Sequence, residues 1–173
     1  MDYYPTLILR ILTPFILSYE LLSKFILPLT LNTSYYIYRL FDPQIFLIDN
    51  YLITFNNSIL FTPACAAISA YFFLLLLTVF TKDIKFLIRL KIFLIGSLTL
   101  FIVNIIRILV LIFVLERSGL SSFEQTHNFF WIFFGSLIVA LIWIYLTKYY
   151  KIKSIPLYSD LKYLLKQINA FKH

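Results

Sequence analysis

Four long apolar runs dominate the chain and predict helices that cross a membrane. Each run is close to the ~20 apolar residues that a transmembrane helix needs, and short polar or charged segments separate them. The first run carries several charges, yet it lacks a basic start and a small-residue cleavage site, so we interpret it as a retained anchor rather than a signal peptide. The predicted spans cover residues 7–31, 64–81, 92–115 and 128–147.

Residues 32–60, between the first two runs, have a pattern typical of short β-strands. Residues 35–38 and 51–55 are rich in β-branched and aromatic side chains, and a polar Asn-Asn-Ser triplet separates the latter from residues 59–62. This pattern predicts a short hairpin-like segment. The expected fold is therefore an all-α integral membrane domain over residues 1–150 with one small β element.

Residues 151–173 form a basic tail with a helical pattern of its own. Ser159 and Asp160 can cap the start of a helix, and lysines alternate with apolar residues after it. We predict an amphipathic helix on the inner membrane surface. Its apolar positions are Leu157, Leu161, Leu164, Leu165, Ile168 and Phe171.

Composition narrows the class of protein further. The chain of 173 residues is 61% hydrophobic and 13% charged, whereas soluble domains are about 45–50% apolar and about 25% charged. A soluble enzyme, a disordered chain and a coiled coil are therefore excluded. The net charge of +7 does not indicate nucleic-acid binding, because the basic residues lie beside the apolar runs, where they orient helices in a bilayer.

The charges of the connecting segments predict the topology. Residues 82–91 and the tail after Thr147 are strongly basic, whereas residues 32–60 and 116–127 each hold one arginine against two acidic residues. The positive-inside rule places the basic pair of segments in the cytoplasm and the other pair outside. We therefore expect a multi-pass protein of the cell membrane with both termini cytoplasmic.

One charge within the predicted spans stands out. Arg107 lies well inside the third span, where an arginine costs roughly 2.5–3.5 kcal/mol on insertion scales. Asn104 precedes it by one helical turn and shares its face. Two interpretations are open: a functional group that faces the bundle interior, or an interhelical clamp that binds backbone carbonyls.

A thiol and an imidazole are predicted at the same depth. Cys65 starts the second span and His127 starts the fourth, so the topology brings both to the outer leaflet with Arg107. His127 could deprotonate Cys65, the thiolate could attack a carbonyl, and Arg107 could stabilise the oxyanion. Taken alone, Cys65 is better explained as a packing residue than as a nucleophile. A single cysteine excludes an internal disulfide and offers no zinc framework, and we expect no cofactor.

These stretches resemble the motifs of a known family. Residues 62–68, Thr-Pro-Ala-Cys-Ala-Ala-Ile, resemble the cysteine motif of the exosortase/archaeosortase family, and residues 104–108 resemble its Asn-x-x-Arg motif. His127 resembles its third motif, and the order and intervals also fit over residues 50–147. The small size and the composition resemble an archaeal member. One departure is Ala67, where the family often has glycine, and it predicts an altered backbone there.

The resemblance implies a membrane-embedded cysteine protease of transpeptidase type. Such enzymes recognise a C-terminal sorting signal on exported proteins, made of a short motif, a transmembrane helix and a basic cluster. They cut near the motif and transfer the new carboxyl end to an acceptor, which is a lipid in archaeal cases. By the same resemblance, Cys65 is the nucleophile, Arg107 the essential arginine, His127 the third catalytic residue and Asn104 a supporting residue.

Two other functions stay open at this point. The chain could be a non-catalytic scaffold or assembly subunit, with Cys65 in its core and Arg107 bound to a partner helix. It could also be a small lipid or solute carrier in which Arg107 holds an anionic headgroup. Both predict that Cys65→Ala is tolerated, whereas catalysis through a thioester predicts that this substitution abolishes activity.

Overall fold

The computed structural model describes residues 3–82, 84–152, 154 and 156. Within these residues the chain forms five helices and one small antiparallel sheet, so the mainly helical fold is confirmed. In chain order the elements are α1 (Tyr3–Ile16), α2 (Tyr19–Arg39), β1 (Phe46–Ile48), β2 (Tyr51–Ile53), β3 (Ser58–Leu60), α3 (Ile68–Phe80), α4 (Phe86–Gly135) and α5 (Leu137–Tyr149). The predicted amphipathic helix of residues 157–171 lies outside the described residues.

The first predicted span, residues 7–31, is divided between two helices. Helices α1 and α2 are bent by 51° at a short break. Ser18 starts α2, and its hydroxyl accepts a hydrogen bond from the backbone N–H of Leu21 at 3.3 Å. Helix α2 then continues to Arg39, so residues 35–38 are helical and not the predicted β-structure. Burial of Thr30, Leu31 and Ser34 against the bundle sustains the helix beyond the predicted end.

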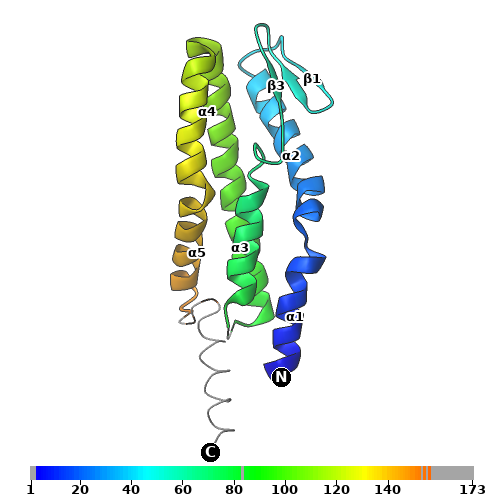
Figure 1. The fold of residues 1–173 in the computed structure, drawn as a ribbon, viewed down its shortest axis with the longest axis vertical. Coiled ribbons are helices and arrows are strands. Elements are labelled where there is room, and N and C mark those ends of the chain that lie inside the picture. Colours follow the sequence, from blue (N-terminus) through cyan, green and yellow to red (C-terminus); the bar gives the residue numbers. More distant parts are fainter. Residues whose placement is uncertain (1–2, 83, 153, 155, 157–173) are drawn as a thin grey trace, which may run out of the picture.

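Helix α4 consists of two arms that fold back on each other. Gly119 has φ 76° and ψ −177°, a conformation open essentially to glycine alone, and the helix reverses there. Figure 1 shows the chain rising through the first arm (residues 86–118) and descending beside it through the return arm (residues 120–135). The loop predicted for residues 116–127 is therefore helical on either side of one glycine.

Four transmembrane helices are not confirmed. By length and composition, Phe86–Trp131 qualifies as a span, and the bent pair Leu7–Ile16 and Tyr19–Arg39 qualifies when taken together. Helices α3 and α5 are apolar but have 13 residues each, about 20 Å at the usual helical rise. A bilayer core is ~30 Å thick. The predicted fourth span, residues 128–147, is divided at Ser136 between the return arm and α5.

The two ends of the molecule differ in charge, as the loop charges predict. Figure 1 places the start of α1, the start of α4 and the end of α5 at one end, and the sheet and the Gly119 turn at the other. The basic start of α4 and the basic end of α5 thus lie opposite the two segments that hold more acidic than basic residues. Between them, large apolar side chains such as Phe15 (76% exposed), Phe25 (70%) and Phe86 (71%) face outward, which fits a lipid-facing surface.

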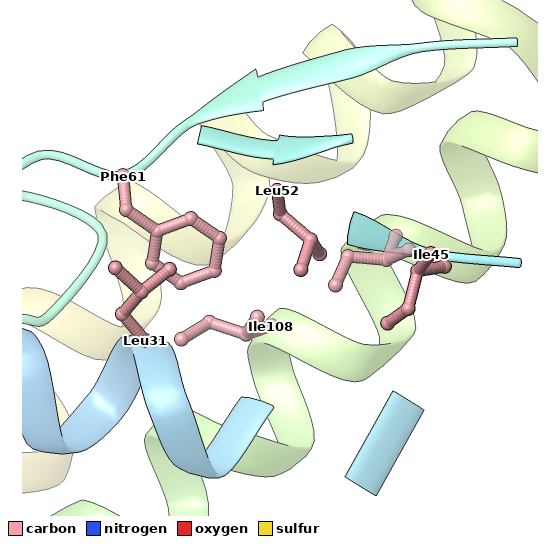
Figure 2. Close-up of a cluster of buried hydrophobic side chains, with 6 residues drawn as sticks. Leu31, Ile45, Leu52, Phe61 and Ile108 are labelled. Carbon is pink, nitrogen blue, oxygen red and sulfur yellow. The ribbon is translucent and has the colours of Figure 1, made fainter. Parts of the chain in front are cut away.

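The sheet covers the end of the bundle and fixes the segment that leads to Cys65. Strands β2 and β3 form the predicted hairpin, and β1 adds a third antiparallel strand that the pattern did not predict. Beneath the sheet, α2, the strands and the first arm of α4 share one hydrophobic cluster against which Cys65 packs. Figure 2 shows Leu31, Ile45, Leu52, Phe61 and Ile108 pointing toward one another in this cluster.

Candidate active site

A cavity of about 400 Å³ lies between α3, both arms of α4 and α5. Its walls are mainly apolar, with contributions from Phe73 of α3, Trp131 of the return arm and Ile138 of α5. Its polar lining includes Asn104 and Arg107 of the first arm. Since both of these side chains are buried, the cavity brings a cationic group into a low-dielectric interior.

The two buried arginines, Arg10 and Arg107, are each 5% exposed, but they differ in how their guanidinium groups are hydrogen bonded. Arg10 donates from Nε to the carbonyl oxygen of Val79 at 2.8 Å and from Nη2 to that of Phe80 at 2.9 Å. Arg107 donates from Nη1 to Asn104 Oδ1 at 3.4 Å, and its buried Nε has no hydrogen-bond partner. Arg10 is therefore the carbonyl clamp, at the C-terminal end of α3, and the clamp interpretation does not describe Arg107.

Asn104 connects Arg107 to the segment that carries the cysteine. Its Nδ2 donates a hydrogen bond to the backbone carbonyl of Cys65 at 3.0 Å, while its Oδ1 accepts from Arg107. The two residues share a face of the first arm, as the helical spacing predicts. One amide side chain thus sets the distance between the cysteine backbone and the guanidinium.

Cys65 lies in a tight turn immediately before α3. The turn is closed by hydrogen bonds from the N–H of Ala66 to the carbonyl of Thr62 and from the N–H of Ile68 to that of Pro63, both 3.2 Å. Ala67 has φ 54° and ψ 36°, a left-handed conformation that an alanine rarely adopts. The position where the family often has glycine therefore has the backbone that glycine favours.

His127 lies within the return arm rather than at the start of a span, which corrects its predicted place. Its ring stacks on Phe123, with centroids 5.7 Å apart, and lies 6.4 Å from the ring of Trp131, which lines the cavity. Arg107 interacts electrostatically with Cys65 and also with His127. Among the described residues, Cys65 and His127 make no hydrogen bond or ring contact with each other. Arg107 is an electrostatic neighbour of both.

Some features of the site cannot be predicted from the sequence. Thr62 belongs to the cysteine motif, yet nothing in the pattern gives it a role, and its hydroxyl lies 3.5 Å from Cys65 Sγ. The contact from Asn104 to Cys65 joins residues far apart in the chain, so spacing alone does not reveal it. Over the described ranges, no group of three or more His, Cys, Asp or Glu side chains is placed to hold a metal ion.

A known family model matches most of the chain. The profile of the transmembrane exosortase family matches residues 4–147. The chain belongs to this family. The matched range includes Cys65, Asn104, Arg107 and His127, and the resemblance drawn from the short motifs is confirmed at the level of the family. Searches of curated proteins and of solved structures found no significant match.

Proposed function

We propose that this transmembrane exosortase is a cysteine protease and transpeptidase that cleaves the C-terminal transmembrane sorting signals of exported proteins. The observation that carries the proposal is Arg107. It is buried without a backbone clamp, lines a cavity, and interacts with the only thiol of the chain and with His127. Family membership supports a membrane transpeptidase-type activity.

The first half of the reaction forms a thioester. His127 accepts the proton of the Cys65 thiol. Sγ attacks the carbonyl carbon of the scissile peptide bond, and the π electrons move onto the oxygen, where the unpartnered Nε of Arg107 is a donor for the oxyanion. As the intermediate collapses, the C–N bond breaks and His127 returns the proton to the leaving amine.

The second half transfers or hydrolyses the acyl group. A hydroxyl or amine of the acceptor, or water, attacks the thioester carbon and gives its proton to His127. The C–S bond then breaks, and the thiolate regains that proton. Because Cys65 and His127 are not hydrogen bonded to each other, these proton transfers require a rotation of the His127 side chain or a bridging water.

The substrate is proposed to enter from the bilayer. The cavity is bounded by three helices with apolar outer faces, and its lining is mainly apolar. A transmembrane tail can reach such a cavity laterally without leaving the membrane, and so can a lipid acceptor. The active site is proposed to lie on the extracytoplasmic side, where the loop charges predict the sheet and the Gly119 turn.

The decisive experiment produces the chain together with a candidate substrate. The substrate is an exported protein of the same cell that ends in a transmembrane helix and a basic cluster. Loss of the tail is followed by mass spectrometry. The wild-type chain is expected to remove the tail, and Cys65→Ala is expected to leave it intact while inserting at the same level. Trapping of a covalent adduct on Cys65 supports the same route. Normal tail removal by Cys65→Ala overturns the proposal.

The same experiment separates the scaffold and carrier functions. If the chain binds a partner helix or an anionic headgroup through Arg107, Cys65→Ala retains function and Arg107→Ala loses it. If the chain is a cysteine enzyme, both substitutions abolish tail removal, because the nucleophile and the oxyanion donor act in one step.

A further inference from the structure

The Cys65 thiol has two polar neighbours within its own turn. The Thr62 hydroxyl oxygen lies 3.5 Å from Sγ, and the carbonyl oxygen of Leu60 lies 3.8 Å from it. A carbonyl only accepts hydrogen bonds, so in the thiol form the S–H points to Leu60. The Thr62 hydroxyl is then left to donate its hydrogen to Sγ.

Loss of the thiol proton changes these two contacts in opposite directions. The Leu60 carbonyl faces a negative sulfur with no hydrogen between them, which is repulsive. The Thr62 hydroxyl remains a donor, and its hydrogen bond to a charged acceptor becomes stronger. The turn holds this geometry, because the carbonyl of Thr62 accepts from the N–H of Ala66, the residue after Cys65.

We propose that Thr62 is a positioning residue that stabilises the Cys65 thiolate by donating its hydroxyl hydrogen to Sγ. The inference rests on the proposed function, in which Cys65 is the nucleophile. It adds a neutral donor from the cysteine motif itself to the guanidinium of Arg107. Thr62 does not touch the substrate; it acts through the sulfur.

Other titratable groups face the same turn and must be held constant. Arg107 on the first arm interacts with Cys65, and His127 on the return arm interacts with Arg107. Tyr35 and Tyr38 of α2 pack against the hydrophobic cluster that Cys65 adjoins. Every comparison therefore keeps Arg107, Tyr35 and Tyr38. The set is measured once with His127 and once in the His127→Gln background, which removes the imidazole titration from the profile.

The test measures the reactivity of Cys65 directly. The chain has one cysteine, so alkylation of the purified full-length protein by iodoacetamide reports on Cys65 alone. The rate is measured from pH 5 to pH 10 for the wild type, Thr62→Val and Thr62→Ser. Thr99→Val is the matched control, because the Thr99 hydroxyl bonds to the carbonyl of Ile95 within α4.

Thr62→Val is expected to move the midpoint of the pH–rate profile up by about one pH unit, since hydrogen bonds to charged groups are among the stronger ones. Below the midpoint its rate falls about threefold, and on the alkaline plateau it rises about threefold, because a more basic thiolate is a stronger nucleophile. The two profiles therefore cross. Thr62→Ser and Thr99→Val are expected to follow the wild type.

Several outcomes overturn the inference. They are an unmoved midpoint, a rate lowered equally at every pH, or a Thr62→Ser profile that matches Thr62→Val. If Thr62→Val melts at a much lower temperature, Thr62→Ala takes its place and must give the same crossing. The alkylation assay needs no substrate. Its outcome is therefore independent of the test of the proposed function, which fails if Cys65→Ala still removes a protein tail.

Discussion

Asn104 Nδ2 lies 3.0 Å from the carbonyl oxygen of Cys65 and donates a hydrogen bond to it. Asn104 is 4% exposed, and its Oδ1 accepts a hydrogen bond from Arg107. Both ends of the amide are therefore used, and the amide cannot turn over without losing both contacts. The Asn-x-x-Arg stretch and the cysteine turn are thus one polar unit joined by a single side chain.

Asn104→Asp tests this unit, because it keeps the acceptor for Arg107 and removes the donor to Cys65. We expect tail removal to fall by about 10²-fold, since a displacement of the proposed nucleophile Cys65 by about 1 Å is enough to cost that much. Membrane insertion should be unchanged. The rate of tail removal is compared with that of Asn32→Asp, an exposed amide of α2 that bonds within its own helix. Equal rates for the two variants contradict the role given to Asn104.

The candidate site could be predicted from the sequence as a set of residues but not as a geometry. A lone cysteine, an arginine within an apolar run and a histidine near the next run stand out because so few polar residues surround them. Their catalytic roles stay predictions. The contacts of Asn104 with Cys65 depend on how the first arm packs against the turn before α3, and spacing along the chain does not encode that packing.

The two buried arginines should respond oppositely to replacement by methionine. Arg10→Met removes two hydrogen bonds from carbonyls at the end of α3, and we expect the free energy of unfolding to fall by about 1–3 kcal/mol. Arg107→Met removes a buried charge with one long hydrogen bond, so stability should be kept or raised. Tail removal should nonetheless be lost in Arg107→Met.

Thermal unfolding in detergent and tail removal, measured on the same preparations, check this pair. A large loss of stability in Arg107→Met would indicate that its guanidinium holds the bundle together. A loss of tail removal in Arg10→Met that exceeds its loss of folded protein would instead assign Arg10 to the reaction. Either result contradicts the prediction that Arg10 stabilises the fold and Arg107 serves tail removal.

Ala67→Gly should stabilise the chain. Ala67 has φ 54°, and the left-handed conformation costs a non-glycine residue about 1–2 kcal/mol. The greater freedom of glycine in the unfolded chain offsets part of this gain, so we expect a net gain of up to about 1 kcal/mol. Ala66→Gly is the control, because Ala66 is fully buried and has no positive φ, and it should lose about 1 kcal/mol. Equal losses in both variants would sink the argument.

The parts of the fold that depend on apolar periodicity could be predicted from the sequence. The turns and bends that depend on a single residue could not. The apolar runs predict the helices of the bundle, and the polar triplet at Asn56 predicts the β2–β3 turn. The charge pattern does not reveal the reversal at Gly119, because Glu116 and Arg117 are typical of a loop. In the structure they continue the helix and leave one glycine to make the turn. The bend at Ser18 depends on one hydroxyl that caps α2.

Glu116 should hold the sheet on the bundle. Its Oε1 accepts hydrogen bonds from the Thr54 hydroxyl and, at 2.9 Å, from Asn57 Nδ2, both in the β2–β3 connection. Strand β3 leads directly into the segment that carries Cys65. Glu116→Ala removes two hydrogen bonds to a charged acceptor, which are worth about 1.5–3 kcal/mol each, and the sheet should open more often.

Amide hydrogen exchange of the protein in detergent measures that opening. In Glu116→Ala we expect the amides of β2 and β3 to exchange at least tenfold faster, while the amides of α3 keep their wild-type rates. Glu124→Ala is the matched control, because Glu124 is exposed on the return arm. If both variants exchange alike over the strands, the hydrophobic cluster beneath the sheet holds it without Glu116. If α3 loosens together with β3 only in Glu116→Ala, the stabilisation by Glu116 extends through the turn to Cys65.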